Sequence, residues 1–110
     1  DATCPWPGGA IPDCGGVIAF LEATSGRRVE MVAGKPSALI LQAALDRLSL
    51  PKTACLMVGD RLATDITMGV RLGIDTALVL TGVTTRAHLA QSALQPTYVL
   101  EGLADLCRAR

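Results

Sequence analysis

Two acidic side chains in this sequence follow the pattern of a cation site at the edge of a sheet. Asp60 comes shortly after the apolar run Ala54–Val58, and Asp65 follows five residues later, in the first turn of the helix expected next. Two carboxylates in one strand–turn–helix unit can converge on Mg²⁺, which binds a few carboxylate oxygens while water and substrate phosphate complete its octahedron. A structural role stays open for both residues: Asp60 can start a turn, and Asp65 can stabilise a helix N-terminus by its charge alone.

Lys35 is the candidate for binding an anion. It precedes Pro36, where another helix is expected to begin. A cation there faces the positive end of the helix dipole, at a cost of roughly a few tenths of a kcal/mol. An anion held between Lys35 and the helix N–H groups would offset that cost. A solvated turn lysine is the alternative, and Lys35 taken alone favours it. Arg27–Arg28 is interpreted as a solvated helix end rather than an anion site.

The elements that must position these residues alternate between strands and helices. Short apolar runs predict the strands, and apolar residues at a spacing of three or four predict the helices. The expected strands are Val29–Ala33, Ala54–Val58, Thr76–Leu80 and Tyr98–Leu100. The expected helices cover Val17–Thr24, Pro36–Leu48, Thr64–Gly73, Thr85–Ser92 and Leu103–Arg108. Strands that are apolar on both faces and alternate with helices predict an α/β fold, a parallel sheet with helices on both faces.

Glycine and proline indicate where these elements end. Gly26 and Gly73 are expected helix C-caps, and residues 4–16, with three prolines and four glycines, an irregular connection. Ligands bind beyond the carboxyl ends of parallel strands, where Gly59–Asp60 and Thr81–Gly82 form two polar clusters. We expect Gly59 to allow the sharp turn that brings the acid after it to the sheet edge. The helix that follows is expected to bury Leu62, Ile66 and Val70, with Gly69 allowing close packing on the same face.

Composition excludes several classes of protein. Half of the 110 residues are hydrophobic, which excludes a disordered tail. Ten basic residues balance ten acidic ones, which argues against a nucleic-acid binder with a basic face. No apolar run approaches the roughly 18 residues that would cross a bilayer. The four cysteines form no CxxC pair, so zinc and thioredoxin-type sites are not indicated, and we expect thiols in a cytoplasmic protein.

The segments VAGKPS (32–37) and MVGDRLATDITMGVRLGIDTALVLTGVTT (57–85) resemble the haloacid dehalogenase superfamily of phosphatases. The run GDRLATDI followed by LVLTGVT is typical of its branch of 4-nitrophenylphosphatase, phosphoglycolate phosphatase, pyridoxal phosphatase and NagD-like enzymes. The opening residues, DATCPWPGGAIPDCGGVIAFLEATSGR, are similar to the segment where these proteins return from a large cap domain to the core. The resemblance covers essentially the whole chain. It implies a partial Rossmann-like sheet, with residues 1–32 as the cap-return segment and its helix and 33–110 as the C-terminal half of the core.

The resemblance also implies a role for each candidate residue. Lys35 matches the family's lysine that holds the transferred phosphoryl group. Asp60 matches its Mg²⁺ ligand, and Asp65 matches the second acid of the same motif, which supports the site and orients the lysine. These roles predict a magnesium-dependent phosphatase that hydrolyses small phosphorylated metabolites through a phospho-aspartate. The balanced charge and the lack of a long apolar run argue against a nucleic-acid or membrane partner.

One departure from the family pattern is decisive for activity. The family's nucleophilic and general-acid aspartates stand two residues apart, and this sequence has no such pair at the end of an apolar strand. We therefore expect about half of an enzyme: the parent is a phosphoric monoester hydrolase, while this fragment is inactive. Without a neighbouring strand, Ala54–Val58 would form an unpaired apolar edge, which favours self-association or pairing with the missing N-terminal half. A non-catalytic phosphate- and Mg²⁺-binding or assembly domain is the alternative function.

Overall fold

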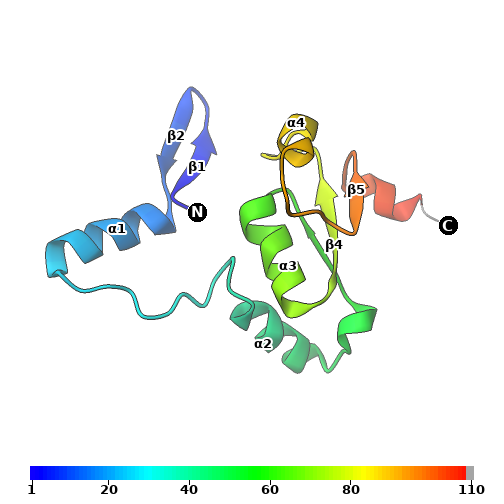
Figure 1. Ribbon diagram of the computed structural model, residues 1–110, viewed down its shortest axis with the longest axis horizontal. Coiled ribbons are helices and arrows are strands. Elements are labelled where there is room, and N and C mark those ends of the chain that lie inside the picture. The colour runs from blue at the N-terminus through cyan, green and yellow to red at the C-terminus, as the bar shows by residue number, and fades with distance from the viewer. Residues whose placement is uncertain (109–110) are drawn as a thin grey trace. The chain divides into compact units, whose positions relative to one another are not determined.

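The computed structural model describes residues 1–108, and the last two residues of the predicted core, 109 and 110, lie outside the described part. The chain forms two compact units, Asp1–Val32 and Ala33–Arg110 (Figure 1). No helix in the described part is both long enough and apolar enough to cross a membrane. The assignment of the first unit to a cap-return segment stays a prediction.

The first unit opens with a β-hairpin, so the prediction of an irregular connection over residues 4–16 was wrong. Strand β1 (Thr3–Trp6) pairs antiparallel with β2 (Gly9–Pro12). Proline disfavours a central strand because it lacks an N–H, but a two-stranded hairpin tolerates it at outward-facing positions. Gly8, with φ 86°, supplies the left-handed residue of the connecting turn. The proline and glycine content therefore marked a tight turn rather than the absence of strands.

Helix α1 (Cys14–Ser25) follows, and it begins three residues earlier than predicted. The side chain of Asp13 accepts the N–H of Cys14 at 2.7 Å and caps this early start. The predicted C-cap is confirmed: Gly26 has φ 68°, and its N–H donates to the carbonyl of Glu22.

The predicted strand Val29–Ala33 is wrong. No strand in the described part of the chain pairs with it, and the apolar run therefore has no ladder of hydrogen bonds to join. The N–H of Val29 donates instead to the carboxylate of Glu22.

The second unit has a parallel sheet in the order β3–β4–β5, which confirms the predicted α/β class. The strands are β3 (Leu56–Gly59), β4 (Asp75–Val79) and β5 (Tyr98–Leu100). The α-helices are α2 (Leu39–Leu48), α3 (Thr67–Leu72) and α4 (Arg86–Ala90). The described part of this unit also has three short helical turns, a 3₁₀ turn at Lys52–Ala54, a π turn at Leu62–Ile66 and a 3₁₀ helix at Leu103–Cys107.

Several predicted boundaries shift in this unit. Helix α2 begins at Leu39, and Pro36 lies in the turn before it rather than at its first position. Strand β3 starts two residues later than predicted, because the 3₁₀ turn uses Ala54. The N-cap predicted at Thr85 is confirmed, since its side chain accepts the N–H of His88. Gly73 ends α3 in the left-handed conformation, as predicted.

The core of the second unit lies between the helices and the sheet. Leu45 of α2 packs with Leu72 and Ile74 from the end of α3 and the segment after it. Gly69 brings α3 close to the sheet, since an added Cβ would lie 2.4 Å from a side-chain carbon of Thr76 on β4. This confirms the close packing predicted for Gly69.

Val70 was predicted to share the buried face and is 47% exposed instead. Ile66, four residues before it, is fully buried, but the covered face of α3 is formed by other residues and Val70 falls outside it. The buried positions of α3 are Met68, Gly69 and Leu72.

Candidate functional site

The loops after β3 and β4 meet at the carboxyl edge of the sheet, where the sequence predicted the site. Asp60 directly follows the last residue of β3. Its Oδ2 accepts the N–H of Val83 at 2.8 Å, and its backbone carbonyl accepts the N–H of Thr84 at 3.0 Å. Gly82 lies so close that an added Cβ would be 2.1 Å from the same carboxylate oxygen. The carboxylate of Asp60 is therefore held against the loop that follows β4.

Asp65 occupies a different environment, inside the fold. Its side chain is 5% exposed, and both of its oxygens have partners. Oδ1 accepts the ammonium of Lys35 at 2.8 Å, and Oδ2 accepts the N–H of Arg61 at 3.1 Å. A carboxylate with both oxygens engaged is suited to positioning a lysine rather than to converging with Asp60 on one cation.

Gly59 makes room for the side chain of Asp65 and does not provide the sharp turn that the sequence suggested. Its backbone is not in the left-handed region. An added Cβ would instead lie 2.3 Å from Cβ of Asp65 and 2.6 Å from Oδ2. Glycine is required here because the buried acid lies directly against the end of β3.

Lys35 lies in a turn before α2, and its side chain is 46% exposed. An arginine of α3, Arg71, donates to the carbonyl of Pro36 at 3.3 Å and ties this turn to the helix. The carboxylate of Asp65 supplies the negative partner that a cation near the start of α2 was expected to need. One face of the Lys35 ammonium is thus fixed by the protein, and the half-exposed side chain stays open to solvent.

The described residues supply only some of the ligands that a Mg²⁺ site needs. Within residues 1–108 no three His, Cys, Asp or Glu side chains are grouped so that they could hold a metal. Asp60 is the candidate carboxylate, because both oxygens of Asp65 are engaged. Mg²⁺ binds proteins through one or two carboxylates and takes its other ligands from water and substrate phosphate. Asp60 therefore fits as one contributor to a Mg²⁺ site.

Two residues that contact the site turns were missed by the sequence analysis, Thr84 in the loop after β4 and Arg71 in the last turn of α3. Thr84 is 6% exposed and contacts the Asp60 turn, and Arg71 anchors the Lys35 turn. Their partners lie 24 and 35 residues away in the sequence, so no local spacing could have indicated either contact.

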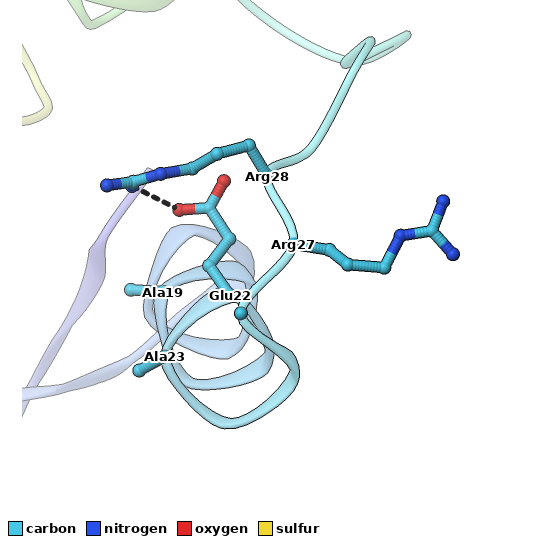
Figure 2. Close-up of a pocket in the computed structure, with 6 residues that line it drawn as sticks. Ala19, Glu22, Ala23, Arg27 and Arg28 are labelled. Atoms are coloured by element: carbon cyan, nitrogen blue, oxygen red, sulfur yellow. Dashed lines mark hydrogen bonds and ion pairs between the residues drawn. The ribbon is translucent and has the colours of Figure 1, made fainter.

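A hollow of about 330 Å³ lies in the first unit at the end of α1 (Figure 2). Arg28 donates to Glu22 at 3.1 Å, while Arg27 points away from that carboxylate. The N–H of Val29 and the charge of Arg28 hold the pKa of Glu22 below its usual value. Both arginines line the hollow, and the carboxylate of Glu22 pairs with Arg28.

The second unit is thus an α/β unit with a lysine–carboxylate pair, Lys35 and Asp65, and a second carboxylate, Asp60, directly after β3. The chain belongs to the HAD-hydrolase-like family, whose model matches residues 32–106. Dihydroxyacetone phosphatase of Corynebacterium glutamicum is 33% identical over 106 residues, covering 96% of this chain and 38% of that protein.

Two solved structures place the chain in a branch of this family. The 4-nitrophenylphosphatase of Thermotoga maritima superposes with a TM-score of 0.91 at 39% identity, covering 99% of this chain and 42% of that one. NagD of E. coli K-12 superposes with a TM-score of 0.80 at 32% identity, covering 96% and 40%. These matches confirm the predicted branch. The chain spans about two fifths of the length of these relatives.

Proposed function

We propose that this chain is the phosphate-holding part of a Mg²⁺-dependent phosphatase, and that the whole protein hydrolyses small phosphomonoesters. The observation that carries the proposal is the buried Asp65 carboxylate, which holds the ammonium of Lys35 at 2.8 Å at the edge where Asp60 lies. The names of the relatives support the substrate class, since dihydroxyacetone phosphatase acts on a small phosphorylated metabolite.

Lys35 is the group that would bind the phosphoryl oxygens. An ammonium has three N–H donors, and its bond to Asp65 uses one of them. The others can donate to an anionic oxygen while the ion pair stays intact. Because Asp65 is buried and fixed, Lys35 would meet the substrate already oriented, and its charge would stabilise the negative charge that moves between oxygens during transfer.

Asp60 would hold the cation. Its Oδ2 accepts the N–H of Val83, so the orientation of the carboxylate is set before any ion binds. Bound Mg²⁺ would neutralise the phosphate oxygens and polarise the phosphorus centre.

The nucleophile must come from outside these residues. No two aspartates stand two residues apart in the sequence, and covalent transfer to a carboxylate needs that group in place. We therefore propose that the 110 residues alone turn over negligibly and that the phospho-aspartate route belongs to the longer protein. Within residues 1–108, β3 pairs on one side only and Leu56 on it is exposed, which supports covering of this edge by the missing part or by a second copy.

The test compares the longer protein with this chain in a phosphate-release assay on small phosphomonoesters with Mg²⁺. We expect activity in the longer protein that Lys35→Met reduces at least a hundredfold, roughly the loss of one charge-stabilising donor. The matched control is Lys52→Met, a lysine that donates to the carbonyl of Leu72 away from this edge. Phosphate release by the 110 residues alone, abolished by Lys35→Met, would contradict the proposal that catalysis needs a nucleophile from the longer protein.

An inactive longer protein that still binds phosphate and Mg²⁺ would favour the alternative, a non-catalytic binding or assembly domain. Sedimentation of the 110 residues tests the open edge: we expect self-association or low thermal stability, and a stable monomer would argue against it. The cytoplasmic location stays a proposal that rests on the cysteine pattern of the sequence alone.

A further inference from the structure

The loop Gly82–Thr84 contacts Asp60 at more than one point. The N–H of Val83 donates to the carboxylate at 2.8 Å, and the N–H of Thr84 donates to the backbone carbonyl of Asp60 at 3.0 Å. Gly82 lies against the carboxylate with no room for a side chain. Both the backbone and the side chain of Asp60 are therefore restrained by one segment, which follows the neighbouring strand.

Thr84 adds a second connection through its side chain. Its hydroxyl oxygen accepts the N–H of Leu62 at 3.4 Å, while its own N–H reaches Asp60. Thr84 is 6% exposed, so little water competes for these bonds. The residue thus holds the turn on both sides of Arg61, from Asp60 to Leu62. We call this set of contacts, made by Gly82, Val83 and Thr84 to Asp60 and Leu62, the loop clasp.

We propose that Thr84 is a positioning residue for the metal-binding carboxylate of Asp60 and acts through the loop clasp. The inference rests on the proposed function of Asp60 and assigns a role to a residue that touches neither metal nor substrate. The loop clasp fixes Oδ2 on Val83, and none of its bonds uses Oδ1. A ligand held in one orientation loses less freedom when a cation binds, and groups that orient metal ligands commonly change affinity about tenfold or more.

The experiment measures Mn²⁺ affinity of the 110-residue chain by water-proton relaxation, with Mn²⁺ alone as the probe. Thr84→Val removes the acceptor for Leu62 and keeps the shape of the side chain. We expect about three- to tenfold weaker binding, which is less than the usual loss because the bond from Leu62 to Thr84 is long, at 3.4 Å. Thr84→Ser keeps the hydroxyl that accepts the N–H of Leu62, so it should bind Mn²⁺ within about twofold of the unchanged chain.

Thr85→Val is the matched control. Thr85 is the next residue, and its hydroxyl oxygen accepts the N–H of His88 to cap α4. Both valine variants lose one side-chain acceptor, so both should lose stability, but only Thr84→Val should lose Mn²⁺ affinity. Equal losses of affinity in the two would mean that binding follows stability, and would overturn the positioning role. Thr84→Ala replaces Thr84→Val if the latter does not fold.

Asp60→Asn separates failure of this inference from failure of the proposed function. If Asp60→Asn binds Mn²⁺ as well as the unchanged chain, the metal role of Asp60 is wrong. If Asp60→Asn abolishes binding and Thr84→Val does not weaken it, only the role of Thr84 is wrong. Paramagnetic broadening of the Val83 amide signal should accompany binding and locate the ion at this edge, and broadening confined to other residues would count against both.

Discussion

Breaking the Lys35–Asp65 ion pair from its two ends should destabilise the protein by unequal amounts. The pair has a 2.8 Å contact between Nζ and Oδ1, but Asp65 is 5% exposed while Lys35 is 46% exposed. Lys35→Met leaves a carboxylate buried with a single remaining partner, the N–H of Arg61. Asp65→Asn leaves an ammonium that can turn into water, and the amide oxygen can still accept from Arg61. The two substitutions remove the same contact, but Lys35→Met leaves a buried carboxylate unpaired and Asp65→Asn leaves a half-exposed ammonium unpaired.

The magnitudes follow from burial. Leaving a buried charge without its partner lowers the free energy of unfolding by about 3–5 kcal/mol. The lower end applies here because water reaches the site beside the half-exposed lysine. We therefore expect about 3 kcal/mol for Lys35→Met. Asp65→Asn should cost about 1.5 kcal/mol, the low end for a hydrogen bond to a charged group. The double variant, Lys35→Met with Asp65→Asn, leaves no unpaired charge. It should lower the free energy of unfolding by about 2 kcal/mol, less than Lys35→Met alone.

The assay is urea unfolding followed by far-UV circular dichroism at pH 7, with the free energy of unfolding compared across the four chains. Arg86→Met is the control, because it breaks the pair with Glu101, in which both side chains are about 70% exposed. That pair should contribute less than about 1 kcal/mol. The reasoning is refuted if Lys35→Met costs no more than Asp65→Asn, or if the double variant costs as much as the two single changes together.

Three further outcomes follow from contacts elsewhere in the chain. Gly82→Ala should destabilise by about 1–3 kcal/mol in the same urea assay, because its Cβ would overlap the acid against it; a neutral result would show that the loop gives way freely. Thr97→Val removes the acceptor for the N–H of the buried Thr76, bonded at 3.0 Å, and should cost about 1–3 kcal/mol. Faster hydrogen exchange of the Thr76 amide would accompany that loss, and unchanged exchange would contradict it. The N–H of Val29 holds the pKa of Glu22 below its usual 4.5, so the stabilisation is present above 4.5 and lost as pH falls through the lower folded pKa. The Val29 amide shift should follow that acid titration and stay constant in Glu22→Gln; movement in both would exclude this bond as the cause.

The part of the fold that depends on local pattern was predictable from the sequence. The apolar runs around β3, β4 and β5 and the caps at Gly26, Gly73 and Thr85 are determined by residues within a few positions of each other. The edge that carries Asp60 follows from the same pattern, because parallel strands end on one side. The predicted parallel sheet therefore needed no knowledge of long-range packing.

The errors arose where a partner outside the local pattern decides the structure. Val29–Ala33 has the composition of a strand, but a strand exists only when another strand pairs with it. Val70 has the right spacing from the buried Ile66, but the covered face of α3 is formed by Met68, Gly69 and Leu72. A proline-rich opening formed a hairpin because Gly8 could turn the chain between two short strands. In each case the local pattern did not identify the segment that the run would pair with or pack against.

The glycines of the site show most clearly why only part of a site at a sheet edge can be predicted from a sequence. Gly59 stands beside Asp60, and adjacency suggested that it turns the backbone for that acid; the structure places Asp65 against it instead. Gly82, which lies 22 residues from Asp60, is the glycine whose missing side chain makes room for that carboxylate. The sequence does not distinguish a glycine that makes room for a neighbouring side chain from a glycine that allows a turn. The side chains that carry charge were therefore recognisable from their types and spacing, whereas the residues that hold them in place became recognisable only once the strands had brought distant segments together.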